Sequence, residues 1–130
     1  MHKRKMNYDK YGISRNRYRE LYYFCKQYAE WKSRVREIDS GVQPYAKKGD
    51  LVKDPTGDLA TERAMLTKKI ELLEATAKEA CSEFWEELIW NASGDTSYSC
   101  LNARYRVPLS ESAFYERRRY FFYLLSKRKM

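Results

Sequence analysis

The segment "VPLSESAFYERRRYFFYLL", from Val107 to Leu125, places three consecutive arginines inside a run of aromatic residues. At about 100° per residue, Phe121 and Leu125 lie within about 20° of Phe114 on a helical wheel. The segment therefore predicts an amphipathic helix. One side of it is apolar and can pack against the rest of the chain, while the other side stays exposed.

The exposed side of this helix is expected to carry small polar, aromatic and arginine residues. We expect Arg119 to point outward from the middle of that side. Arg117 and Arg118 are expected at its margins, beside the core, where they reach sideways toward phosphates. Ser112 and Tyr115 share the outward side. A surface of this kind on the N-terminal half of a helix is typical of a helix that enters the major groove of DNA.

A short helix is predicted before this segment, covering about residues 97–104. Asp95 or Thr96 is expected to cap its N-terminus, because short polar side chains accept hydrogen bonds from the first free amides of a helix. Its inward face is expected to consist of Tyr98, Leu101 and Tyr105.

A turn is predicted between the two helices. Pro108 disfavours helical backbone at the residue before it, so residues 106–109 are expected to form the turn. Ser110 then caps the last helix, and Leu109 is placed to pack on Phe114 as a hydrophobic staple. The order of short helix, turn and longer basic helix predicts a helix-turn-helix.

Two longer helices are predicted upstream, separated by a loop. Ser14 can cap a first helix that runs to about Ile38. Five glycine and proline residues fall within residues 40–57 and predict a long loop. Thr56 or Asp58 is expected to cap a second helix, which ends near Gly94 with that glycine in the left-handed conformation.

The second helix carries apolar residues in steps of three and four, and this near-heptad seam requires a partner helix. The partner is either the first helix, in an antiparallel hairpin, or a second copy of the long helix in a homodimer; the two arrangements can coexist. The seam consists of Leu66, Ile70, Leu73, Ala77, Ala80, Phe84 and Leu88.

The predicted fold class is all-α, with a long antiparallel helical hairpin followed by a C-terminal helix-turn-helix. The predicted divisions are an N-terminal basic helix in residues 1–39, a loop in 40–57, a long acidic helix in 58–94 that packs on the first, and the helix-turn-helix in 95–130, with its recognition helix at about 110–127.

Charge is unevenly distributed along the 130 residues, whose formal net charge is +8. Residues 1–50 hold 13 basic and 6 acidic side chains, residues 51–95 hold 5 and 10, and residues 96–130 hold 8 and 2. Two basic ends flanking an acidic middle favour an anionic partner such as nucleic acid. On the first helix, Arg15, Arg19 and Lys26 share one edge. They either contact phosphates or pair with the acidic second helix, and both alternatives stay open.

The sequence offers no pattern of catalytic or metal-binding residues, so we expect no enzyme activity and no cofactor. Its one histidine is His2, and it has no glycine-rich phosphate loop and no paired carboxylates beyond ordinary helix-surface glutamates. Cys25, Cys81 and Cys100 are odd in number and widely spaced, which indicates reduced thiols. No apolar run approaches 18 residues, and no apolar segment follows the first charges, so we expect a cytoplasmic protein without a membrane span.

Three segments resemble the small phage and prophage proteins grouped with the RinA/ArpU-type late transcriptional regulators. They are "YGISRNRYRELYYFCKQYAEWK", "DPTGDLATERAMLTKKIELLEATAKEA" and "VPLSESAFYERRRYFFYLLSKRK". The resemblance covers most of the chain and implies a C-terminal helix-turn-helix like region 4 of sigma-70 factors, and transcriptional control of prophage genes. It implies a DNA-contact role for the last helix, onto which Ser110, Ser112, Tyr115, Arg117, Arg118 and Arg119 map.

The function predicted is therefore a non-catalytic, sequence-specific regulator of transcription that binds double-stranded DNA. Two alternatives stay open: a helical interaction module that docks on RNA polymerase or a phage protein, and a DNA-packaging recognition subunit like a small terminase. The predicted DNA contacts are Ser110, Ser112, Tyr115, Arg117, Arg118, Arg119, Lys127, Arg128 and Lys129, with Arg15, Arg19 and Lys26 as secondary phosphate contacts.

Overall fold

A computed structural model of the chain describes residues 11–41, 55–94 and 96–129, without the side chains of residues 55 and 56. The regular structure in these ranges is entirely α-helical, which confirms the all-α part of the predicted fold class. None of the described helices is long and apolar enough to cross a membrane. The helices are α2 (Arg15–Cys25), α3 (Tyr28–Ser40), α4 (Pro55–Ala80), α5 (Trp85–Ala92), α6 (Tyr98–Tyr105) and α7 (Glu111–Arg128).

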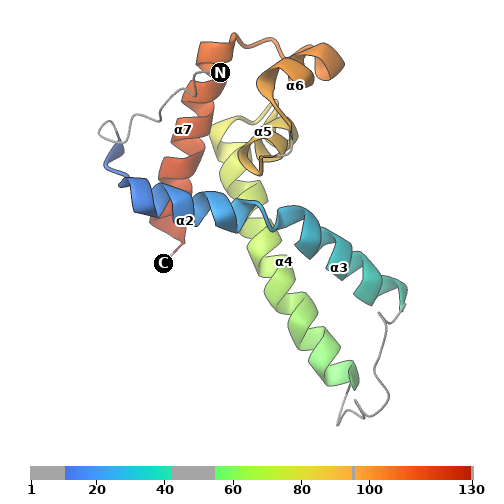
Figure 1. Ribbon diagram of the computed structural model, residues 1–130. Coiled ribbons are helices and arrows are strands. Elements are labelled where there is room, and N and C mark those ends of the chain that lie inside the picture. Colours follow the sequence, from blue (N-terminus) through green and yellow to red (C-terminus); the bar gives the residue numbers. More distant parts are fainter. Residues whose placement is uncertain (1–10, 42–54, 95, 130) are drawn as a thin grey trace.

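The helices form a body and a projecting arm (Figure 1). The arm consists of α3 and the N-terminal part of α4, which contact each other and run in opposite directions. In the body, α7 packs along the C-terminal part of α4, and α2 crosses against α7 and α5. The α6–α7 turn lies at the end of the molecule opposite the arm.

The predicted first helix is broken into two. Ser14 caps α2 as predicted, accepting a hydrogen bond from the Arg17 amide at 3.1 Å. The helix ends at Cys25, and the Gln27 amide bonds the Phe24 carbonyl in a tighter turn before α3 begins. This break has a packing reason, because it lets α2 lie against α7 and α5 while α3 follows α4.

The predicted long helix over 58–94 is also broken, after Ala80. A turn closed by the hydrogen bond from the Phe84 amide to the Cys81 carbonyl, 3.2 Å long, separates α4 from α5. The turn folds α5 back on α4, so that Leu88 and Ile89 are buried in the body. Gly94 adopts the left-handed conformation as predicted, with φ of 86°, but it follows the short α5.

The predicted loop over 40–57 is shorter than expected, and most of it lies outside the described residues. Ser40 still belongs to α3, and α4 begins at Pro55. The predicted caps Thr56 and Asp58 therefore lie inside the first turn of α4, where an acidic side chain such as that of Asp58 favours the helix dipole.

The core joins all six described helices, with α3 contributing Tyr28 and Trp31. Because a helix without a buried side is marginal in water, this shared core holds the helices together. Nine large apolar side chains are fully buried in it: Leu21, Leu73, Leu88, Ile89, Leu101, Phe114, Phe121, Phe122 and Leu125.

Charged and polar contacts join the two helices of the arm. The Arg34 guanidinium donates to both Glu62 oxygens, at 2.7 and 2.9 Å, and Arg63 pairs in the same bidentate way with Asp39. Tyr28 donates to Glu74 at 2.6 Å. The pKa values of the Glu62 and Asp39 carboxyls are lowered, chiefly by the hydrogen bonds from the two arginines. These contacts fix the register of α3 on α4.

Candidate nucleic-acid interface

The turn between α6 and α7 is held from both sides. Tyr98 of α6 donates a hydrogen bond to the Leu109 carbonyl, and its ring lies 5.4 Å from that of Phe114. Leu109 is half-buried against the core that contains Phe114, where the staple was predicted. Ser110 caps α7 as predicted and accepts from the Ala113 amide at 3.1 Å. These contacts set the angle of α7 relative to α6.

Two expectations for α6 were wrong. The cap is Ser97, which accepts from the Cys100 amide at 3.2 Å, rather than Asp95 or Thr96. The Thr96 amide instead donates to the Trp90 carbonyl. Tyr105 is 44% exposed instead of facing the core, because it lies beyond Leu101 at the end of the helix, with its ring 5.4 Å from Trp90.

The apolar side of α7 is confirmed, but the predicted position of Arg119 is wrong. Phe114, Phe121 and Leu125 are fully buried. The Arg119 side chain is only 16% exposed and pairs with Glu116 of the preceding turn at 2.7 Å. Its guanidinium is engaged inside the protein rather than presented from the middle of an open face.

Tyr11 is one of the residues that cover the side of α7 on which Arg119 lies. Its hydroxyl donates to Glu116 at 3.1 Å, and its ring lies 5.1 Å from that of Tyr123. A residue from before α2 thus lies on the side of α7 that the helical wheel places outward. Because Glu116 also holds Arg119, the three side chains form one connected group.

Arg118 is surrounded by aromatic rings. Its guanidinium carbon lies 5.0 Å from the Phe122 centroid and 5.8 and 5.9 Å from those of Tyr18 and Tyr115. An arginine over aromatic faces is attracted by their quadrupoles. Arg118 therefore joins α7 to α2, and both Arg118 and the half-buried Tyr115 are engaged in packing.

The charge of Arg118 also affects Cys25 of α2, whose thiol is buried. Burial raises the pKa of the Cys25 thiol to about 12, and the positive charge of Arg118 opposes this rise without cancelling it. Cys81 is also buried, whereas Cys100 is exposed on α6. The three thiols therefore differ in reactivity, because only a thiolate that the reagent can reach is a nucleophile.

We expect a chromogenic thiol reagent at pH 8 to titrate one thiol rapidly in the folded protein and two more after denaturation. Cys100→Ser should remove the fast phase, and three fast thiols in the native protein would contradict the described burial.

The folded-state pKa of Cys25 exceeds the ordinary thiol value of 9.0. The buried neutral thiol of Cys25 therefore stabilises the folded state fully below pH 9.0, and this stabilisation is lost as the pH rises above 9.0. Chemical denaturation at pH 8 and pH 10 measures that loss.

Two predicted contact residues in the first half of α7 are free of the core. Ser112 and Arg117 are exposed, and Arg117 forms no ion pair with any described residue. Ser110 is exposed as well, but its hydroxyl oxygen is used by the cap. Of the three consecutive arginines, Arg117 is thus the one whose side chain is open to solvent, the reverse of the predicted order.

The C-terminal end of α7 is tied to two other helices. Arg128 donates to the Thr76 hydroxyl at 3.1 Å and pairs with Glu79, so its guanidinium contacts α4. Arg17 of α2 donates to the Ser126 carbonyl at 2.9 Å and to the Lys129 carbonyl, which satisfies free carbonyls at the end of α7.

The two lysines at this end lie over aromatic rings. The Lys129 ammonium is 4.8 Å from the Phe24 centroid, and that of Lys127 is 5.0 Å from the Tyr123 centroid. Lys127 is exposed and Lys129 is half-buried. The stems of both residues pack while their charges stay near solvent, as is common for long basic side chains.

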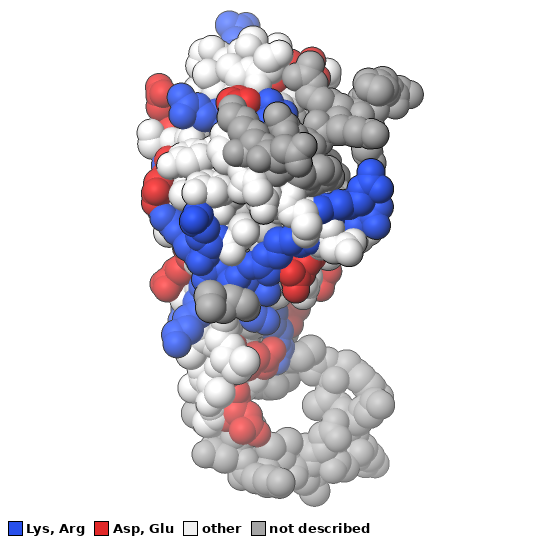
Figure 2. All heavy atoms as spheres, turned by 90° about the vertical axis from the view of Figure 1, so that its left-hand side faces the viewer, with Lys and Arg blue, Asp and Glu red and all other residues white. Residues whose placement is uncertain are grey.

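Arg15, Arg19 and Lys26 do not pair with α4 within the described chain. The N-terminal basic side chains that pair with α4 come from α3: Arg34 with Glu62, and Lys32 with Glu74 at 3.7 Å. Arg15 and Arg19 on α2 are exposed and form no ion pair with a described residue, and the Lys26 ammonium lies 5.3 Å from the Tyr22 ring centroid. We call Arg15, Arg19 and Lys26 the α2 edge. Figure 2 shows Lys and Arg side chains gathered across the middle of the face on which α2 begins.

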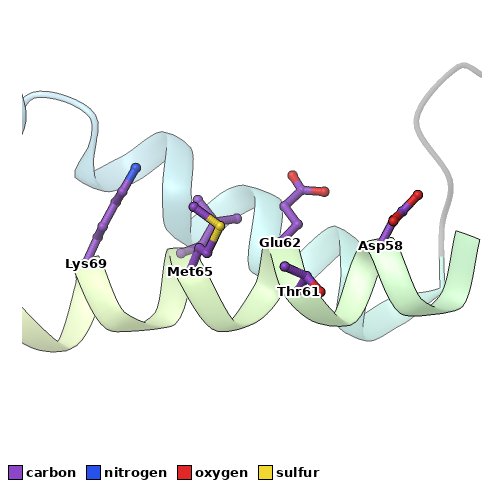
Figure 3. Close-up of a pocket in the computed structure, with 6 residues that line it drawn as sticks. Asp58, Thr61, Glu62, Met65 and Lys69 are labelled. Carbon is purple, nitrogen blue, oxygen red and sulfur yellow. The ribbon is translucent and has the colours of Figure 1, made fainter.

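The arm carries a separate feature, a shallow hollow of about 320 Å³ along α4 (Figure 3). Met65 is 57% exposed beside it, and the hollow is flanked by charged residues. Within the described ranges, no three His, Cys, Asp or Glu side chains are grouped so as to hold a metal ion. The lining residues are Asp58, Thr61, Glu62, Met65, Leu66 and Lys69.

Three features of this region have no clear signal in the sequence. Arg17 caps the end of a helix more than 100 residues away, and Tyr11 lies on α7 from an equally distant position. Arg106 adopts left-handed backbone, with φ of 50°, although such positions usually carry glycine. All three depend on tertiary contacts or local backbone geometry that residue spacing alone does not specify.

Comparisons with models of known protein families, with curated proteins and with solved structures found no match for this chain. The fold defines an all-α protein in which a body carries a two-helix arm (Figure 1), and Lys and Arg side chains gather on one face of it (Figure 2).

Proposed function

We propose that the protein is a non-catalytic regulator of transcription that binds double-stranded DNA. The observation that carries the proposal is the contrast between two sets of basic residues. Lys32 and Arg34 of α3 pair with carboxylates of α4, whereas Arg15 and Arg19 of α2 are exposed without a described ionic partner. Phosphates of a duplex would supply the missing negative charge, and such contacts dominate affinity for DNA.

The proposed docking uses α6, the turn and α7 as a helix-turn-helix. The N-terminal half of α7 would face the major groove, with Ser112 and Arg117 toward base edges or the adjacent backbone. The α2 edge and Lys127 would contact phosphates and fix the register of the protein on the duplex. The resemblance to late regulators of prophages agrees with this proposal and suggests the genes controlled.

The test is duplex binding measured as a function of salt, by gel shift or fluorescence anisotropy. Four phosphate contacts, from the three residues of the α2 edge and Lys127, would give a slope of log affinity on log salt of about −3.6, hence a loss of roughly 150-fold between 50 and 200 mM salt. Sequence preference would be located by selection from a random duplex pool. No binding at micromolar protein in 50 mM salt would refute the proposal.

A second candidate is the interaction module, favoured by the hollow on α4 and the exposed Met65. RNA polymerase retained by the protein in the absence of DNA would support it. A homodimer through the long helix would have to use the arm, because Leu73, Ala77 and Ala80 of the predicted seam are already buried within the monomer. Ring-shaped oligomers in native mass spectrometry would instead support a packaging subunit.

A further inference from the structure

Arg106 has a backbone conformation that, among the other described residues, occurs only at glycines. Among the described residues, Gly12, Gly41, Gly94 and Arg106 have positive φ, and Arg106 is the one with a side chain. Left-handed backbone brings Cβ close to the following carbonyl oxygen, so it is unfavourable for arginine and nearly free of cost for glycine.

The conformation itself is required by the turn. The Arg106 amide donates to the Asn102 carbonyl at 2.9 Å, which closes the end of α6. The chain then reverses, so that Val107 enters the core with 5% exposure and Leu109 reaches Tyr98. These contacts are made by the backbone or by neighbouring residues, and glycine at position 106 would preserve them.

The side chain of Arg106 has no structural task in the described chain. It is exposed, and it forms no ion pair or ring contact with a described residue. Arg104, two residues earlier, lies in the last turn of α6, where a cation favours the helix dipole. Backbone strain of this kind is common at functional sites, so an exposed arginine without an ionic partner in the described chain points to a function for its guanidinium.

We infer that Arg106 is a phosphate-binding residue that anchors the α6–α7 turn to the DNA backbone. This inference rests on the proposed function. In helix-turn-helix docking, the second helix enters the groove while the element before it crosses the backbone. Figure 1 places the turn at the end of the body from which α7 begins, where a duplex strand would border the groove. A guanidinium binds phosphate bidentately, which suits an anchor of orientation.

The experiment compares Arg106→Gly and Arg106→Lys with the wild type. Glycine should raise the melting temperature by about 2 to 5 °C by relieving the backbone. It should also weaken duplex binding about tenfold, with the salt slope reduced by about 1 and the sequence preference unchanged. Lysine keeps the charge and should bind within about threefold of the wild type. Arg36→Ala, which removes one exposed charge from α3, is the matched control and should leave binding unchanged.

Three results would overturn the inference: wild-type affinity in Arg106→Gly, a loss no larger than that of Arg36→Ala, or a lower melting temperature with glycine. The last would mean that the arginine serves the helix end. Failure of the proposed function is a separate result, because it would appear as absence of duplex binding by the wild type itself.

Discussion

Replacing both Arg15 and Arg19 with alanine is expected to weaken duplex binding by roughly 100-fold, because a hydrogen bond to a charged group contributes about 1.5 kcal/mol or more. Both side chains lie on the exposed side of α2 and pair with no described carboxylate. Both guanidinium groups are therefore accessible to an anionic ligand without first breaking an ion pair with a described residue. Two lost phosphate contacts should also reduce the salt slope by about 1.8, without changing the preferred sequence.

This double variant should keep the fold of the wild type. The contacts of α2 with the rest of the protein are made by other residues, including Arg17, Leu21 and Cys25. The melting temperature, followed by circular dichroism, should therefore stay close to that of the wild type. A loss of affinity in a protein of unchanged stability would locate the effect at the surface of α2.

The matched control is Arg36→Ala combined with Lys68→Ala. It removes the same charge from the arm, at exposed positions that form no ion pair with a described residue. If the control weakens binding as much as the test variant, the attraction comes from net charge and not from the α2 edge. Wild-type affinity in the test variant would remove α2 from the interface altogether.

The local signals in the sequence were sufficient for the helix starts that depend on one side chain. Ser14 and Ser110 cap their helices as predicted, because an N-cap needs only its own hydroxyl and the amide three residues on. The apolar side of α7 was equally predictable, since Phe114, Phe121 and Leu125 follow from the helical period alone.

The breaks between helices were not predictable in the same way. No glycine or proline marks Lys26 and Gln27, or the turn from Cys81 to Phe84, and the apolar period continues through both. At these bends the chain turns so that α2 lies against α7 and α5, and α5 packs back on α4 with apolar residues in the core. Propensity is weak enough for such tertiary packing to override it.

The sequence specifies which residue types α7 carries, but not which of their side chains the fold leaves exposed. The helical wheel places Arg119 outward, but a wheel contains no information on what other segments cover. Tyr11 and Glu116 lie on that side of α7, so Arg119 is engaged and Arg117 is open. The internal pairing of α3 with α4 similarly depends on which helices the fold brings together.

Phe122→Ala is expected to lower the free energy of unfolding by about 3 to 5 kcal/mol, as for other large aromatic residues truncated in a core. Phe122 is fully buried where α7 meets α2. Its ring meets that of Tyr18 edge-on at 4.9 Å and that of Phe121 at 5.2 Å, and it also supports the Arg118 guanidinium. Alanine would leave a cavity where α7 meets α2. The half-buried Arg118 guanidinium would also lose one of the aromatic rings around it.

Urea denaturation, followed by circular dichroism and tryptophan fluorescence, measures this loss. Domains of this size are stable by only about 5 to 15 kcal/mol, so the variant should unfold at a much lower urea concentration. Tyr23→Ala is the matched control, because Tyr23 is an aromatic residue on α2 that is 62% exposed, and its loss should cost less than about 1 kcal/mol. Equal midpoints for the two variants would show that α2 does not pack on α7 through Phe122. The position of the α2 edge beside α7 would then lose its structural basis.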